Sequence, residues 1–235
     1  MPGIVDHALV GVDDAAAVET ESELSKKHRL GGAASFAELR RIIAADLYRY
    51  EGRTGLKAFT KHYWFTPGFR YSFWMRVCGY FLRHAVWRYT LYIPAKMMLL
   101  RYRYKFGIAI PEYTRIGPGL FINRFGGVMI NGDAVIGANF NITHGAMVGQ
   151  LNRGPRRGSP VIGDRVFLAS GAKIIGHITL GDDCAVGANA VVTRDVPPKA
   201  VVVGIPGKPI SYDGSAAYVN RTVEPDEFAK RSPRP

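Results

Sequence analysis

Hydrophobic positions recur every six residues through the second half of the chain. The clearest run is Ile162, Leu168, Ile174, Leu180, Val186 and Val192, and most of these residues are followed by a small one. In a parallel β-helix each hexad supplies one short strand, the aliphatic side chain points into a shared core, and the small residue permits a tight corner. The pattern therefore predicts a mainly β fold built as a parallel β-helix.

The same period extends towards the N-terminus, with two interruptions. The earlier hexad positions are Ile110, Ile116 and Ile122 in one phase and Ile130, Ile136, Ile142 and Val148 in another, which makes thirteen hexads in all. A two-residue slip at Gly126 and Gly127 separates the phases, and a bulge or turn absorbs such a slip. The second interruption, Gln150 to Pro160, is rich in Gly, Pro and Arg, so we expect a loop that leaves the coil surface.

The first half of the chain shows a helical pattern instead. Hydrophobic residues follow Ser35 at spacings of three and four as far as Leu47, and Glu38 completes a capping-box pattern with Ser35. Aromatic residues then alternate with Arg and Lys, without the run of about 18 apolar residues that a membrane-spanning helix needs. The predicted organisation is a disordered leader (1–34), a basic helical segment (35–107), the β-helix (108–210) and a flexible tail (211–235).

The net charge of +12 is concentrated in one of these segments. Residues 35–107 carry +11, whereas residues 1–34 carry −3 and residues 108–210 carry +4. Two interpretations of the basic segment stay open: a helical subdomain packed on the end of the coil with solvated cations, or peripheral contact with an anionic membrane surface. We expect no nucleic-acid partner, because no nucleic-acid-binding motif accompanies the charge.

Location and redox state follow from the cysteines and the N-terminus. The two cysteines, Cys78 and Cys184, give no disulfide framework, and the first residues lack the basic start and apolar run of a signal peptide. We therefore expect a cytoplasmic protein. The basic segment suggests, in addition, a peripheral position at the inner face of the membrane.

The segment PRRGSPVIGDRVFLASGAKIIGHITLGDDCAVGANAVVTRDVPPKAVVVGIPGKPI resembles the hexapeptide-repeat acetyltransferases of the serine acetyltransferase branch. The preceding segment, from IGPGLFINRFGG to NRGPRRG, looks closest to the O-acetyltransferases of polysaccharide biosynthesis. The resemblance covers about residues 36–210. It implies a left-handed coil, a homotrimer, and acetyl-CoA as co-substrate bound between adjacent subunits, with no metal.

The resemblance also implies a histidine general base, since the ordinary pKa of histidine suits proton removal from a hydroxyl group near neutral pH. In most relatives this histidine precedes an FGG-like turn, where this chain has Arg124; a family acid aligns with Ala109, and a second family histidine aligns with Ser159. Counting hexads places His144 one coil after Arg124. Neighbouring strands are about 4.8 Å apart, so the two side chains could reach nearly the same volume. We predict His144 as the base and Arg124 as the residue that orients the acceptor or polarises the thioester; His177 is the less favoured alternative.

Hexad counting further places Gln150, Ser170 and Ala188 in one register. By resemblance, small residues along a coil let the pantetheine arm of CoA lie against the backbone, and exposed cations meet its phosphate groups. The predicted cofactor-binding residues are Gly149, Ser170, Ala188, Arg156, Arg157 and Lys208, and Arg153 is a further candidate.

The predicted function is an acetyl-CoA-dependent O-acetyltransferase acting on a hydroxyl of a sugar or glycan intermediate. The basic loop, the basic aromatic segment and the altered serine-site positions favour a large anionic acceptor. Two alternatives remain: a serine O-acetyltransferase of cysteine biosynthesis, and a noncatalytic trimeric scaffold that binds CoA or a glycan. A hexapeptide-fold carbonic anhydrase is excluded, because only two histidines lie in the predicted coil and a zinc site of that kind needs three.

Overall fold

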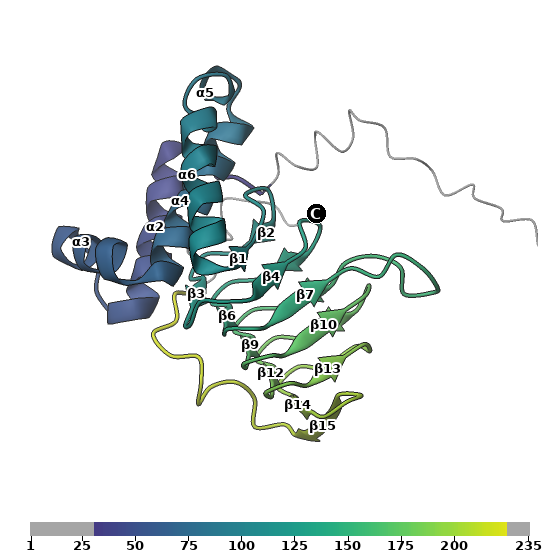
Figure 1. Cartoon of the computed structure of the whole chain (residues 1–235). Helices are drawn as coiled ribbons and strands as arrows, with labels where there is room; N and C mark the ends of the chain where they lie inside the picture. The colour runs from purple at the N-terminus through teal and green to yellow at the C-terminus, as the bar shows by residue number, and fades with distance from the viewer. Residues whose placement is uncertain (1–30, 225–235) are drawn as a thin grey trace, which may run out of the picture.

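The computed structural model describes residues 31–224 of the 235-residue chain. Most of the predicted leader, and the last part of the predicted tail, lie outside these described residues. Within them the chain forms a helical unit that stands on one end of a three-faced coil of short strands (Figure 1). No helix among residues 31–224 is long and apolar enough to cross a bilayer.

The N-terminal segment is helical, as predicted. Its helices are α2 (Phe36–Glu51), α3 (Leu56–Phe65), α4 (Pro67–Arg83), α5 (Ala85–Arg88) and α6 (Tyr92–Phe106). Ser35 caps α2, since its hydroxyl accepts a hydrogen bond from the Glu38 N–H at 3.1 Å, while the Glu38 carboxylate accepts one from the Ala34 N–H at 2.7 Å. The capping residues that the sequence predicted therefore start the helix.

The hexads form a left-handed parallel β-helix with three faces. Face A contains β1 (Ile108–Ala109), β4 (Val128–Ile130), β7 (Met147–Gly149), β10 (Lys173–Ile175) and β13 (Val191–Val192). Face B contains β2 (Arg115–Ile116), β5 (Val135–Ile136), β8 (Val161–Ile162) and β11 (Thr179–Leu180). Face C contains β3 (Phe121–Ile122), β6 (Asn141–Ile142), β9 (Phe167–Leu168), β12 (Ala185–Val186), β14 (Val201–Val203) and β15 (Lys208–Ser211).

The six-residue period sets the pairing of these strands. Ile122 pairs with Ile142, and Ile142 pairs with Leu168 on the next coil. Every predicted hexad position is buried, so the coil interior is a column of stacked aliphatic side chains. Because each residue pairs with its equivalent one coil away, position in the hexad decides which edge or face a side chain occupies.

The two interruptions behave differently in the coil. Gly126 and Gly127 both have left-handed backbone (φ +100° and +66°) in the turn between β3 and β4, which accommodates the extra two residues. The loop 150–160 joins β7 on face A to β8 on face B, which are consecutive strands, so it replaces no hexad. It closes on itself through paired backbone hydrogen bonds between Leu151 and Gly158, at 3.0 and 2.9 Å.

Buried polar contacts join the helical unit to the first coil. Asp46 of α2 and Arg76 of α4 form an ion pair at 3.0 Å, and both reach the coil backbone. Arg76 donates to the carbonyl oxygens of Ile116 and Gly117, and Asp46 accepts from the N–H groups of Gly119 and Leu120 at 2.9 and 2.8 Å. These bonds use polar groups that burial would otherwise leave unpaired, and they fix the helices relative to the coil.

The segment that follows β15 runs back along face C towards the helices (Figure 1). Sequence composition predicted a flexible tail from residue 211, but residues 211–224 pack on the coil. Val219 is buried, the Tyr218 ring stacks on Phe167 at 4.7 Å, and Asn139 exchanges two hydrogen bonds of 2.8 Å with the backbone of Val223. We call residues 211–224 the return strap. The sequence of the return strap does not predict these contacts, because side chains of the coil form most of the hydrogen bonds, and they bind the backbone of the strap.

Candidate active site

One edge of the coil carries the predicted catalytic residues. The pairing of Ile122 with Ile142, Leu168 and Val186 puts the residues two positions later in one column, where face C turns into face A. That column, the His144 edge, consists of Arg124, His144, Ser170 and Ala188. The structure therefore places Arg124 and His144 in equivalent positions one coil apart, as the hexad count predicted.

His144 lies exposed at this edge and contacts a neighbouring hydroxyl. Its Nδ1 is 3.4 Å from Oγ of Ser170 on the next coil, and its Nε2 has no partner among the described residues. The backbone turns sharply after it, because Gly145 has left-handed φ (+71°) and donates its N–H to Gly126 at 2.8 Å. The turn presents the imidazole to solvent beside a second polar group.

A lysine that the sequence did not single out lies next to this histidine. The Lys173 ammonium on β10 donates a hydrogen bond to the carbonyl oxygen of Gly145. The hexad count places Lys173 on a face of the coil, but it does not give the direction of the lysine side chain. The contact with Gly145 could therefore not be predicted from the sequence. Lys173 adds a positive charge to the His144 edge, which suits the negative charge that develops on an oxygen during acyl transfer.

The three positions at which the family pattern expects one acid and two histidines carry other residues in this chain. Arg124 is exposed in the turn between β3 and β4, and its guanidinium has no partner among residues 31–224. Ala109 on β1 offers a methyl group, which has no acid or base chemistry. Ser159 donates its hydroxyl to Asn131 at 3.0 Å. His144 is therefore the histidine that the structure places beside Arg124.

A second edge, where face A turns into face B, carries the basic loop. This loop edge contains Gly149, the loop 150–160 and His177, whose N–H donates to the Arg156 carbonyl at 2.9 Å. The prediction that Gln150 shares a register with Ser170 and Ala188 is wrong. Ile175 pairs with Gly149, so Gln150 lies beside Gly176. Leu168 pairs with Ile142, so Ser170 lies beside His144 instead. The count failed because it let the loop replace one hexad.

The predicted CoA-binding residues are consequently divided between the two edges. Ser170 and Ala188 lie on the His144 edge, and Lys208 on β15 pairs with Val203 near the same edge. Gly149, Arg156 and Arg157 lie on the loop edge. Arg156 forms an exposed ion pair with Asp195 at 3.4 Å, while Arg153 and Arg157 are exposed. Within one chain the structure does not bring these two groups together.

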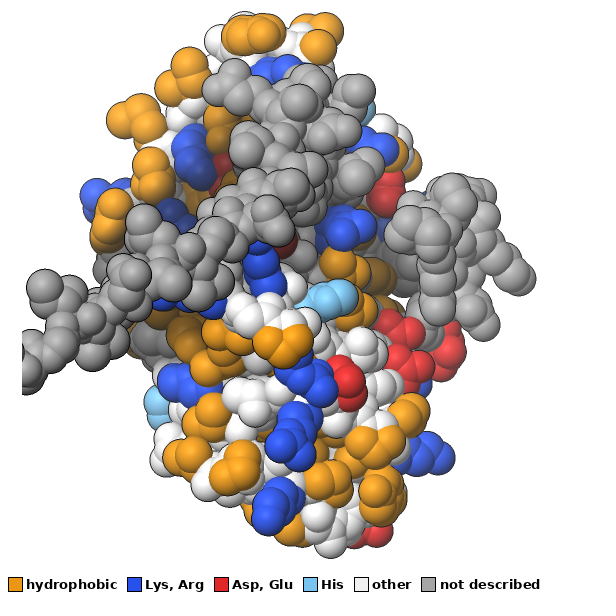
Figure 2. Space-filling view, turned by 90° about the vertical axis from the view of Figure 1, so that its right-hand side faces the viewer, with side chains coloured by type: hydrophobic (Ala, Val, Ile, Leu, Met, Phe, Trp, Pro, Cys, Tyr) orange, Lys and Arg blue, Asp and Glu red, His pale blue; other side chains and the backbone are white. Residues whose placement is uncertain are grey.

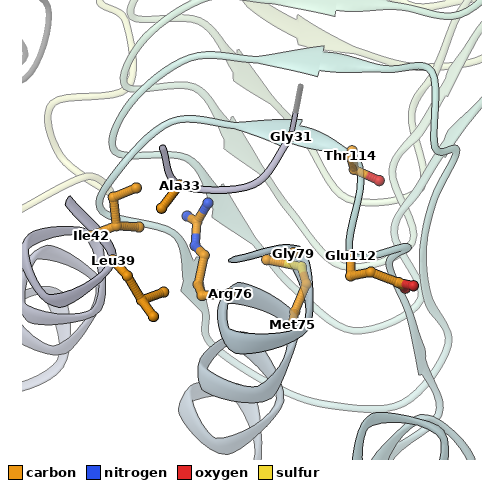
Figure 3. Close-up of a pocket in the computed structure, with 9 residues that line it drawn as sticks. All are labelled: Gly31, Ala33, Leu39, Ile42, Met75, Arg76, Gly79, Glu112 and Thr114. Carbon is orange, nitrogen blue, oxygen red and sulfur yellow. The ribbon is translucent and has the colours of Figure 1, made fainter. Parts of the chain in front are cut away.

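A small pocket lies elsewhere, between α2, α4 and the first coil (Figure 3). Among the residues that line it, Arg76 and Glu112 are already paired with Asp46 and Lys96, and Thr114 has a buried hydroxyl without a partner among the described residues. None of the predicted site residues lines this pocket. Residues 31–224 also contain no group of His, Cys, Asp and Glu that could hold a metal ion.

Known proteins match both the coil and the whole described structure. A family model described as "Bacterial transferase hexapeptide (six repeats)" matches residues 159–194. The serine acetyltransferase of Mycobacterium tuberculosis is 38% identical over 134 residues, which are 57% of this chain and 58% of that enzyme. The serine acetyltransferase of Helicobacter pylori is 37% identical over 134 residues, which are 57% of this chain and 78% of the other.

Solved structures agree with these matches. The serine acetyltransferase of Neisseria gonorrhoeae superposes with a TM-score of 0.61 at 30% identity, covering 81% of this chain and 74% of the other. The Brucella abortus serine acetyltransferase in complex with coenzyme A gives a TM-score of 0.58 at 26% identity, covering 74% of this chain and 66% of the other. The similarity thus includes the helical unit as well as the coil.

These matches correct two predictions from the sequence. The curated relatives at 37–38% identity are serine acetyltransferases, so the prediction of a sugar or glycan acceptor is wrong. The predicted special closeness to polysaccharide-biosynthesis O-acetyltransferases is likewise not supported. The error arose because the cationic loop and Arg124 were taken as evidence of a large anionic acceptor, whereas such cations equally suit the phosphate groups of a CoA molecule.

Proposed function

Since this chain belongs to the serine acetyltransferase family of hexapeptide-repeat transferases, we propose that it transfers the acetyl group of acetyl-CoA to the hydroxyl group of serine. The observation that carries the proposal is the exposed His144 imidazole, held beside Ser170 and Lys173 on the edge that also carries Arg124. This edge combines a group able to accept a proton with cations able to stabilise an oxyanion.

The proposed reaction assigns a step to each of these side chains. His144 Nδ1 lies 3.4 Å from Ser170 Oγ. We assign the proton of the neutral imidazole to Nδ1, so that the Nε2 lone pair is free to take the proton of the acceptor hydroxyl. The hydroxyl oxygen attacks the thioester carbonyl, and Arg124 and Lys173 stabilise the negative charge on the carbonyl oxygen. The C–S bond then breaks, and the thiolate of CoA takes the proton from His144.

The cofactor-binding residues support a site shared by neighbouring copies. Ser170 and Ala188 offer a narrow surface beside His144, whereas Arg156 and Arg157 lie on the other edge. In a homotrimer with cyclic symmetry, the His144 edge of one subunit faces a different edge of the next. We therefore assign the pantetheine arm of CoA to the His144 edge and its phosphate groups to the loop of the adjacent subunit.

The test is acetyl transfer from labelled acetyl-CoA by the full chain, with serine and a panel of other hydroxyl compounds as acceptors. We expect O-acetylserine, identified by mass spectrometry, together with one equivalent of free CoA thiol. Transfer to another hydroxyl compound but not to serine would contradict the proposed acceptor. Binding of CoA without transfer to any acceptor would instead favour the noncatalytic scaffold.

A further inference from the structure

The end of the helical unit farthest from the coil exposes a group of large apolar side chains. They come from α5, from the turn that follows it and from the first turns of α6, and we call them the α5 tip: Val86, Trp87, Tyr89, Leu91, Ile93 and Met97. Val86, Tyr89 and Met97 are 75%, 77% and 67% exposed, and α5 buries none of its residues. A soluble protein surface rarely gathers this many apolar side chains in one place without a partner.

The arrangement of α6 explains why the tip stays uncovered. Ala95 and Leu99 of α6 are buried against α4, so the opposite side of the helix faces outward. Residues on that outer side recur every four positions as Ile93, Met97, Arg101 and Lys105, all exposed. The outer stripe is therefore apolar next to the tip and basic about 12 Å further along the helix, at 1.5 Å per residue.

The positive charge of the segment around the tip, residues 52–111, indicates an anionic partner. Residues 52–111 contain no Asp or Glu and eleven Lys or Arg residues, of which Lys61, Arg76 and Lys96 are paired with acids of adjoining segments and the other eight have no acidic partner of their own in this segment. Figure 2 shows hydrophobic and basic side chains together at the end of the molecule that carries α5. Such a surface repels cationic partners and attracts anionic ones, whose attraction acts over about 10 Å at ordinary ionic strength.

We propose that the α5 tip docks on an anionic phospholipid bilayer. The aliphatic side chains of Val86, Leu91 and Ile93 enter the acyl boundary, Trp87 and Tyr89 lie at the headgroup level, and the cations of the segment attract the phosphate groups. Nucleic acid fits less well, because it offers nothing apolar to exposed aliphatic side chains. The tip and the His144 edge lie at separate parts of the molecule, so docking leaves that edge open (Figure 1).

The first test measures binding of the full chain to phosphatidylcholine vesicles with and without phosphatidylglycerol. We expect binding to the anionic vesicles alone, weakened by added salt. The variant Val86→Ser/Ile93→Ser should bind at least about tenfold more weakly, since binding scales with buried apolar area. The matched control is Ile210→Ser/Tyr212→Ser, which removes two side chains of 66% and 62% exposure at the other end of the molecule and should bind as the parent does.

The second test uses Trp87 as a reporter. Brominated phosphatidylglycerol should quench the tryptophan fluorescence of the parent protein, and Trp87→Phe should abolish most of that quenching even though Trp64 and Trp74 remain. The inference is overturned by absence of binding to anionic vesicles, by equal binding of the parent and the Val86→Ser/Ile93→Ser variant, or by quenching that persists in Trp87→Phe. Because every substituted side chain is exposed, unfolding is not the expected cause of a loss.

Discussion

His144 lies among groups that determine which of its two ring nitrogens is available. Ser170 Oγ is 3.4 Å from Nδ1, and the Lys173 ammonium binds the carbonyl oxygen of the adjoining Gly145. A hydroxyl that occupies Nδ1 leaves Nε2 as the nitrogen that faces solvent and substrate. The proposed base and the Lys173 cation thus lie on adjacent coils, although they are 29 positions apart in the sequence.

Replacing His144 tests this assignment. His144→Ala should lower kcat for O-acetylserine formation by at least about 100-fold, the usual range for loss of a general base, with a smaller change in the KM for acetyl-CoA. His177→Ala is the matched comparison, because His177 is also exposed on the coil but lies on the loop edge, which we assign to the phosphate groups of CoA; its loss should change the KM for acetyl-CoA more than kcat. Steady-state kinetics measures both constants. A kcat of His144→Ala equal to that of the parent would show that His144 is not the general base.

Glu112 provides a second prediction for a single residue. Burial disfavours its charged form, but hydrogen bonds from Lys96 at 2.7 Å and Tyr92 at 2.6 Å outweigh burial and hold the pKa of Glu112 below its usual 4.5. A carboxylate with a lowered folded-state pKa stabilises the protein above the unfolded pKa. That contribution is lost as the pH falls through the folded pKa.

Glu112→Gln should therefore lower the free energy of unfolding by about 1–3 kcal/mol at neutral pH. The difference between parent and variant should begin to shrink as the pH falls below about 4.5, the ordinary pKa that Glu112 has in the unfolded chain, and should disappear once the pH is below the lowered pKa of the folded state. Urea unfolding followed by circular dichroism at several pH values measures this difference. A difference that stays constant across the acid range would show that the carboxylate charge is not what stabilises this contact.

At this scale the sequence predicts positions better than contacts. The six-residue period places Arg124 and His144 in one column, because strand pairing repeats every coil. It does not reveal the Lys173 contact, nor the buried Asp46–Arg76 pair, because both depend on how long side chains cross between elements. Those directions follow from packing in three dimensions, which periodicity does not encode.

Among the elements, the strands follow from the sequence and the connections do not. Each aliphatic hexad position is buried and all but Ile110 lie in a strand, and Ser35 starts α2 as its capping pattern predicts. The length of loop 150–160 does not show that the loop begins and ends on neighbouring faces. The predicted register of Gln150 with Ser170 therefore assumed, wrongly, that the loop takes the place of one hexad. The return strap was taken as flexible because its few apolar residues pack singly against the coil and show no period.

The return strap can be tested as an element. Tyr218→Ala/Val219→Ala should lower the free energy of unfolding by about 2–3 kcal/mol, from lost methyl burial and loss of the aromatic stack on Phe167. Tyr212→Ala, which removes a 62% exposed ring at the start of the strap, is the control and should change stability little. Chemical denaturation measures both, and equal stability of all three proteins would mean that the strap contributes nothing.

For the whole molecule, we proposed that the predicted site is shared by neighbouring copies. The reason is that His144 and the loop cations lie at different corners of the coil within one chain. In a cyclic trimer each site would take one edge from each of two subunits. Inactive variants of the two edges should then restore each other.

Co-expression of His144→Ala with Arg156→Ala/Arg157→Ala tests this arrangement. Random mixing leaves about a quarter of the intersubunit sites with both intact edges, so the co-expressed protein as a whole should recover about a quarter of the parental rate. The two variants mixed after separate purification, without exchange of subunits, are the control. If co-expressed variants are no more active than the separate ones, each chain contains a complete site.

The last strand, β15, covers the C-terminal end of the coil. β15 runs antiparallel to β14, and the Gly207 N–H donates to the Val191 carbonyl at 2.7 Å, so the final coil has its backbone groups occupied on two faces. The helical unit covers the opposite end of the coil. An uncapped parallel coil would offer a template for another chain and would extend into a filament. Within residues 31–224 the helical unit and β15 therefore leave no open parallel end on which another coil could add, so this coil does not extend into a filament.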